Sequence, residues 1–267
     1  MTRPEGLPIL KLEGLSVGYH GRALVDGITF ELAPGTIACV VGRNGSGKST
    51  VLRTIAGQLN PLGGRVLVNG RPASERRLWR RARIYRIGFL VQGQRHFPAL
   101  SVREHLHLAL WYSRKNWRAR EFEIQRLVDD PPFSALANAV DRSASTLSGG
   151  QDMILGLAKC VLQDCQLLLL DEPSTGLSVV HRNEVFPYLR VLAEHRAILM
   201  VEQSMSVAFG HSDVVYQIRK RAGQGPEEAL ACVRVNADVK ASIAASYRAG
   251  RAAEASDAVA ALLGGGS

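Results

Sequence analysis

A glycine-rich loop constrains this chain more than any other feature. Residues 42–49 read Gly-Arg-Asn-Gly-Ser-Gly-Lys-Ser and lie between a β-branched apolar run at 36–41 and a helical pattern at 49–59. Successive glycines let backbone N–H groups converge on phosphate oxygens, and the following helix adds its dipole and free N–H donors. Because the loop follows a strand and opens a helix, it predicts a nucleotide-phosphate site in a mainly parallel α/β sheet.

The loop residues divide into phosphate contacts and a metal ligand. We expect Lys48 to reach the β- and γ-phosphates of ATP, and the hydroxyl of Ser49 to coordinate Mg²⁺. The remaining nucleotide contacts are expected from Gly42, Asn44, Gly45, Ser46, Gly47 and Thr50. The loop therefore implies ATP and Mg²⁺ as the bound groups.

Two acidic residues, Asp171 and Glu172, follow a run of four leucines at 167–170. A carboxylate at the C-terminal edge of a buried strand beside the loop is placed to hold Mg²⁺, and we assign this role to Asp171. Glu172 points to the opposite side and is the candidate for orienting or deprotonating the attacking water. An acidic turn before Pro173 without a catalytic role is the alternative.

The pentad Leu147-Ser148-Gly149-Gly150-Gln151 lies between these two motifs. Ser148 is expected to cap a helix that begins there. In this order, the three motifs resemble those of the nucleotide-binding subunit of ATP-binding cassette (ABC) transporters, over about residues 9–215. The resemblance implies that the helix start presents Ser148 and Gly150, with Gly149 and Gln151 beside them, to the γ-phosphate held by a second subunit. ATP would then be hydrolysed only in a dimer.

The resemblance assigns three further residues. Tyr19 matches the aromatic residue that stacks on adenine. Gln92 matches the glutamine that contacts Mg²⁺ and the attacking water. We therefore expect it to be a metal ligand and, like Glu172, a catalytic residue. Gln203 occupies the position where most members carry a histidine, and we include it in the catalytic set. A glutamine can donate a hydrogen bond but cannot change its protonation near neutral pH, which argues against proton shuttling there.

Alternating patterns divide the chain into parts. The first 35 residues alternate apolar and polar positions between glycines, which predicts short antiparallel strands. From about residue 93 to residue 162 the pattern is mainly helical, and a capping box at Ser101 and Glu104 lies near its start. We therefore expect an α/β fold, a P-loop ATPase core over residues 1–218, with an N-terminal antiparallel β subdomain and an inserted helical subdomain.

The C-terminal part departs from the family pattern. The short strand pair that usually closes the core is not apparent after Tyr216, and residues 226–233 and 238–263 have helical periodicity. We therefore treat residues 219–267 as a C-terminal extension, either a surface appendage or a partner-binding segment.

Four short runs, at 42–45, 97–100, 176–177 and 201–203, resemble one branch of the family. That branch comprises the ATPases of importers for branched-chain amino acids, urea or short amides. It implies permease partners, a second ABC ATPase that is identical or different, an indirectly coupled solute-binding protein, and a peripheral place on the cytoplasmic face of the membrane. An exporter ATPase, a soluble ABC ATPase acting on ribosomes or DNA, and a subunit that binds ATP without turnover are the alternatives.

The charge of the chain is concentrated in one stretch. Residues 65–126 hold 15 Lys and Arg against 4 Asp and Glu, a net +11, whereas the whole chain carries +9. A solvated arginine-rich face, contact with anionic lipid headgroups, and nucleic-acid binding are the three interpretations. No nucleic-acid-binding signature is present, so we expect no nucleic-acid partner. The four cysteines lack metal-ligand spacing and predict reduced structural thiols.

Overall fold

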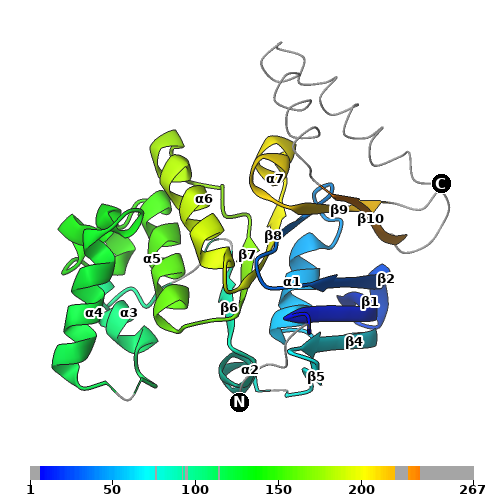
Figure 1. The fold of residues 1–267 in the computed structure, drawn as a ribbon, viewed down its shortest axis with the longest axis horizontal. Helices are drawn as coiled ribbons and strands as arrows, with labels where there is room; N and C mark the ends of the chain where they lie inside the picture. The colour runs from blue at the N-terminus through cyan, green and yellow to red at the C-terminus, as the bar shows by residue number, and fades with distance from the viewer. Residues whose placement is uncertain are drawn as a thin grey trace, which may run out of the picture.

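The computed structural model describes residues 7–75, 77–91, 93, 96–113, 115–219 and 228–234. Two sheets organise this part of the chain (Figure 1). The smaller sheet is antiparallel and has the strand order β2-β1-β4-β5, with the bounds Leu10–Tyr19 for β1, Arg22–Leu32 for β2, Gly63–Val68 for β4 and Arg71–Pro72 for β5. This sheet confirms the expected antiparallel β subdomain, with strands longer than the alternation suggested.

The larger sheet has the strand order β10-β9-β3-β8-β7-β6 and is parallel from β9 to β6. Its strands are β3 (Ile37–Val41), β6 (Ile87–Leu90), β7 (Leu167–Asp171), β8 (Ala197–Glu202), β9 (Val214–Arg219) and β10 (Glu228–Arg234). β3, β7 and β8 are buried along their whole length, as expected for central strands covered on both faces. The predicted P-loop type of fold is thus confirmed.

Helices cover both faces of this sheet. They are α1 (Lys48–Ala56), α2 (Leu78–Tyr85), α3 (Val102–Ala109), α4 (Trp117–Asp129), α5 (Gly149–Leu162), α6 (Val179–Ala193) and α7 (Met205–His211), with 3₁₀ turns η1 (Phe133–Ala139) and η2 (Ala144–Thr146). Alternate residues of the central strands enter two separate cores, because successive side chains of a strand point to opposite faces. Cys39 and Met200 pack with α3, α5 and α6, whereas Val40 and Leu199 pack with α1 and the smaller sheet.

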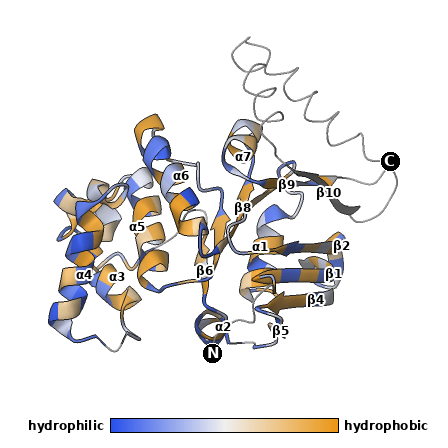
Figure 2. Ribbon diagram, in the orientation of Figure 1, coloured by the Kyte–Doolittle hydropathy of each residue, from blue (hydrophilic) through white to orange (hydrophobic). Residues whose placement is uncertain are grey.

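The helical segment α3 to α5 follows β6 in the chain and returns to β7, and it gathers on one side of the molecule, opposite the smaller sheet (Figure 1). The capping box predicted at Ser101 and Glu104 is present at the start of α3. In Figure 2 the strands of the central sheet are predominantly hydrophobic, whereas α4 carries hydrophilic residues along its length. No helix in the part of the chain described here is both long enough and apolar enough to cross a bilayer.

Two expectations for helix ends and strands are wrong. The helix predicted over 49–59 ends at Ala56, because Gly57 adopts a left-handed conformation (φ 88°) and its N–H bonds back to the last turn. The helical pattern at 226–233 overlaps strand β10, which pairs antiparallel with β9 in the register Cys232 with Tyr216. The backbone groups at the edge of β9 favour pairing over the local helical periodicity. The larger sheet therefore includes part of the segment predicted as a C-terminal extension, whereas the helical pattern at 238–263 lies outside the described residues.

Candidate functional site

The glycine loop lies between β3 and α1, as the sequence predicts. Gly47 precedes α1 with φ 94°, and a Cβ at this position would lie 2.7 Å from Cγ2 of Val25, so a larger residue is excluded. No side chain caps α1, which leaves its first N–H groups open to a ligand. The hydroxyl of Ser46 is buried and has no hydrogen-bond partner among the described residues. These features fit an anionic phosphate group at the loop.

Lys48 lies across the loop. Its ammonium donates hydrogen bonds to the carbonyl oxygens of Gly42 at 2.9 Å and Arg43 at 3.1 Å, and its side chain is almost fully buried. The charge is thereby held against the loop at the start of α1, where phosphate oxygens are expected.

Ser49 and Asp171 meet at the end of β7. The hydroxyl of Ser49 donates a hydrogen bond of 2.8 Å to Oδ1 of Asp171. Burial raises the pKa of the Asp171 carboxyl; the hydrogen bond from Ser49 lowers it, and the nearby carboxylate of Glu172 raises it. A carboxylate and a hydroxyl that already touch supply the hard oxygen ligands that Mg²⁺ prefers. The residues thus fit the predicted metal site, and burial of the carboxylate favours a cation beside it.

Glu172 has other hydrogen-bond partners than Asp171. Its backbone adopts φ 51°, and its Oε1 accepts a hydrogen bond of 2.5 Å from Nε2 of Gln203, which follows β8. Thr175 also donates to Glu172, at 3.4 Å. The structure therefore brings Glu172 and Gln203 together from the ends of two neighbouring strands.

A cavity of about 390 Å³ joins most of these groups. It is lined by the loop from Asn44 to Thr50 together with Tyr19, Leu24, Glu172 and Gln203. Tyr19 is partly exposed (37%), and its phenol oxygen accepts a hydrogen bond of 3.4 Å from Thr50. An exposed ring at the mouth of a phosphate site is available for stacking on a base. Gln92 lies outside the described residues, so its predicted contacts stay a prediction.

The pentad opens helix α5, as predicted. Ser148 accepts a hydrogen bond from the N–H of Gln151, and the Gln151 side chain accepts one from the N–H of Ser148. The Gln151 amide also donates to the carbonyl of Ala135 at 3.0 Å. None of residues 148–151 lines the cavity above the glycine loop. Within one copy of the chain, the pentad thus lies outside the cavity above the loop, and Gly149 lines a smaller cavity of about 220 Å³ with Asp171 and Glu172.

Comparison with known proteins decides the family. Residues 25–175 match the family model described as ABC transporter, and this match spans more than half of the chain. The chain belongs to the ABC transporter family.

Curated relatives within the family carry several descriptions. A Nod factor export ATP-binding protein of Rhizobium meliloti is 36% identical over 211 residues, which cover 77% of this chain and 61% of that protein. A probable siderophore transport ATP-binding protein of Bacillus subtilis is 30% identical and covers 85% of this chain and 84% of its own length. A molybdenum import ATP-binding protein of Rhizobium etli is 33% identical over 65% of this chain. These descriptions name one export system and two uptake or transport systems, and none names amino acids or urea.

The chain spans about three fifths of the Nod factor protein, so that protein extends beyond the shared region. Among solved structures, a nucleotide-free ABC-transporter cassette superposes with a TM-score of 0.71 at 21% identity, covering 88% of this chain and 94% of its own. A dimeric cassette in a post-hydrolysis state with ADP and Pi superposes with a TM-score of 0.72 at 19% identity, covering 85% and 99%. These matches show that this ABC chain has the cassette fold.

Sequence reasoning missed two residues beside this candidate site, Glu202 and Ser174. Glu202 is buried at the end of β8, directly before Gln203, and accepts hydrogen bonds of 2.9 Å from both the N–H and the hydroxyl of Ser174. It thereby ties the segment after Glu172 to β8. An acidic residue at the end of the apolar run 197–201 was the available signal, since a buried charge requires partners.

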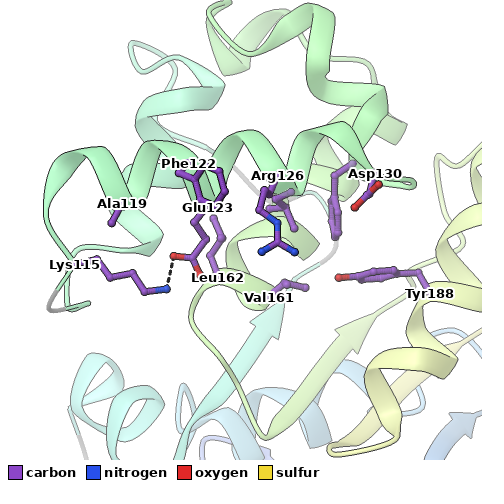
Figure 3. Close-up of a pocket in the computed structure, with 11 residues that line it drawn as sticks. Lys115, Ala119, Phe122, Glu123, Arg126, Asp130, Val161, Leu162 and Tyr188 are labelled. Atoms are coloured by element: carbon purple, nitrogen blue, oxygen red, sulfur yellow. Dashed lines mark hydrogen bonds and ion pairs between the residues drawn. The ribbon is translucent and has the colours of Figure 1, made fainter.

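A second cavity, of about 570 Å³, lies in the helical part and shares no residue with the predicted site (Figure 3). It is lined by residues of α4, η1, the end of α5 and α6, among them Phe122, Arg126 and Tyr188. An ion pair of 2.6 Å between Lys115 and Glu123 crosses one end. Its walls are mostly apolar, and none of the residues predicted to bind ATP or Mg²⁺ lines it.

Proposed function

We propose that this chain binds ATP with Mg²⁺ and hydrolyses it as a dimer, in which the glycine loop of one copy faces the pentad of the other. The separation of the loop cavity from residues 148–151 within one copy carries this proposal. The pentad begins a helix whose first N–H groups can bind an anion, so it is a second phosphate-binding surface without a phosphate site of its own. Two copies arranged head to tail about a twofold axis would complete two sites.

The proposed chemistry assigns one task to each group. Lys48 and the N–H groups of the loop neutralise the phosphate oxygens, and Tyr19 stacks on the adenine. When bound, Mg²⁺ withdraws charge from the phosphate oxygens, and Ser49 and Asp171 would hold it. Glu172 takes a proton from the water that attacks the γ-phosphoryl group, and ADP and phosphate leave. Gln203 holds the Glu172 carboxylate in place through its hydrogen bond.

We further propose that ATP hydrolysis drives a membrane permease, which would place the chain on the cytoplasmic face of the membrane. The family membership supports a transport role. Our first candidate is an importer for branched-chain amino acids, urea or short amides, with a solute-binding protein as an indirect partner; the short runs named in the sequence analysis support it. An exporter is the second candidate, because the Nod factor export protein is 36% identical.

Complementation between inactive variants tests the dimer. Lys48→Ala removes the loop cation, and Ser148→Ala removes the pentad hydroxyl, so each variant alone should lack ATPase activity. In a mixed dimer, one site combines an intact loop with an intact pentad, and activity should return on mixing. A mixture that stays inactive while both variants dimerise would contradict the shared site.

A separate experiment tests the transport role. The intact protein is purified from membranes, and the integral-membrane partner that accompanies it is identified and reconstituted in vesicles. Uptake of a radiolabelled branched-chain amino acid, urea or amide that requires ATP supports the importer. ATP-dependent movement in the opposite direction supports the exporter.

A further inference from the structure

All three tryptophans of the chain are more than half exposed. The exposed fractions are 55% for Trp79, 65% for Trp111 and 63% for Trp117. A large aromatic side chain in water exposes apolar surface that folding normally removes, and tryptophan is enriched at protein interfaces and at the headgroup level of membranes. Exposed tryptophans therefore point to a surface that a membrane or a partner covers.

Two of these tryptophans belong to one surface. The inward side of helix α2 carries the buried residues Arg81 and Tyr85. Arg81 donates hydrogen bonds to the carbonyls of Thr54 and Ile55, and Tyr85 donates one to the carbonyl of Pro72. Its opposite side exposes Trp79, Arg80, Arg83 and Ile84. Arg83 lies over the ring of Tyr112, with its guanidinium carbon 4.7 Å from the ring centre, and Tyr112 and its neighbour Trp111 follow α3. We call Trp79, Arg80, Arg83, Ile84, Trp111 and Tyr112 the aromatic–arginine patch.

The charge of this patch has one sign. Residues 76–86 hold six arginines and no acidic residue. Of these arginines, Arg81 is buried, Arg86 pairs with Asp164, and Arg80 forms a long ion pair of 3.9 Å with Glu75. Exposed arginines beside exposed indole rings attract anions and at the same time offer apolar contact.

We propose that the aromatic–arginine patch binds the surface of an anionic lipid bilayer. Arg80 and Arg83 contact the headgroup phosphates, and Trp79, Trp111 and Tyr112 enter the headgroup layer. Ile84, which is 55% exposed, favours lipid over nucleic acid, because an aliphatic side chain gains from acyl chains but offers no surface for stacking on bases. Helix α2 is anchored to the protein by its inward face, whereas its outward face is apolar and cationic. A short helix of this kind can lie in the plane of the membrane interface. Lipid binding by the patch requires no ATP hydrolysis.

Vesicle binding of the intact purified chain tests the patch. Vesicles of phosphatidylcholine alone are compared with vesicles containing about one third phosphatidylglycerol, in the absence of any permease. We expect cosedimentation with the anionic vesicles only, weakened by added salt because ions screen exposed charges. The tryptophan emission should shift to shorter wavelength and be quenched by brominated acyl chains.

Matched variants locate the contact. Arg80→Glu with Arg83→Glu should weaken binding at least about twentyfold, since each surface cation contributes about fivefold to affinity for an anionic membrane. Arg22→Glu with Arg182→Glu makes the same charge change at exposed sites outside the patch and should retain binding within about fivefold of the parent chain. Trp79→Phe with Trp111→Phe should remove most of the emission shift, whereas Trp117→Phe should retain it.

Three outcomes would overturn the proposal. The first is equal binding to neutral and anionic vesicles, and the second is an equal loss in the two charge-reversal variants. The third is that the chain binds no vesicle but binds a single-stranded oligonucleotide or a detergent-solubilised membrane protein through the patch arginines. Circular dichroism of each variant confirms that it is folded.

Discussion

The amide of Gln203 donates a hydrogen bond of 2.5 Å to Oε1 of Glu172. The two residues lie at the ends of the neighbouring parallel strands β7 and β8, so the sheet itself brings them together. A histidine at position 203 could exchange a proton with Glu172, whereas a glutamine only orients the carboxylate. The proposed catalytic pair is therefore independent of protonation at position 203.

Gln203→Ala should lower the ATP turnover rate about 10- to 100-fold with little change in the affinity for ATP, because a hydrogen bond to a charged carboxylate contributes about 1.5–3 kcal/mol. Gln203→His should restore part of the rate and make it depend on pH between about 6 and 7, where an imidazole titrates. Steady-state kinetics across pH measure both effects. A pH-independent Gln203→His enzyme with an unrestored rate would argue against contact with Glu172 during turnover.

Glu172→Gln should reduce hydrolysis at least about 100-fold, because it removes the group that accepts the proton from water. ATP binding should persist, and the uncleaved nucleotide should trap a dimer that size-exclusion chromatography detects. Glu194→Gln, at an exposed position after α6, is the control and should leave the rate unchanged. A steady-state rate that Glu172→Gln leaves unaltered would contradict the assigned role.

Lys48→Ala should weaken ATP binding at least about 100-fold, because it removes a cation that lies 2.9–3.1 Å from two loop carbonyls and faces the phosphate site. Arg43→Ala changes an exposed cation in the same loop and should have little effect. Equilibrium titration with a fluorescent ATP analogue measures the two affinities. Comparable losses in both variants would mean that general loop charge, and not Lys48, holds the phosphates.

Two serines make the same capping box in different places. Ser148 caps α5, and Ser101 caps α3. Each change to alanine should cost about 1 kcal/mol of stability through loss of the cap. Only Ser148→Ala should also abolish ATPase activity, because its hydroxyl is proposed to contact the nucleotide of the partner copy. Thermal unfolding and ATPase assays on both variants separate capping from catalysis, and equal activities would count against the shared site.

Asp171→Asn should stabilise the nucleotide-free protein while weakening its Mg²⁺-dependent ATP binding. Burial raises the pKa of the Asp171 carboxyl above that of the unfolded chain, which is about 4. Between these two pKa values the folded state binds more protons, so the contribution of this group to stability falls as pH rises through that window. The variant should therefore unfold at a higher temperature than the parent at pH 8, and this difference should shrink as the pH approaches 4. Thermal scans across pH check the sign; a variant that is less stable at pH 8 would contradict it.

The sequence by itself determined the glycine loop, the apolar strands and the capped helices, because each depends on residues close together in the chain. Gly47 before α1, the leucine run ending at Asp171, and the serine caps were all predicted in place. Only the tertiary structure decided which distant groups meet. The contacts of Gln203 with Glu172 and of Ser174 with Glu202 follow from the order of strands in the sheet, which no local pattern contains. Strand β10 shows the same dependence, since its backbone pairs with β9 although its own residues favour a helical period.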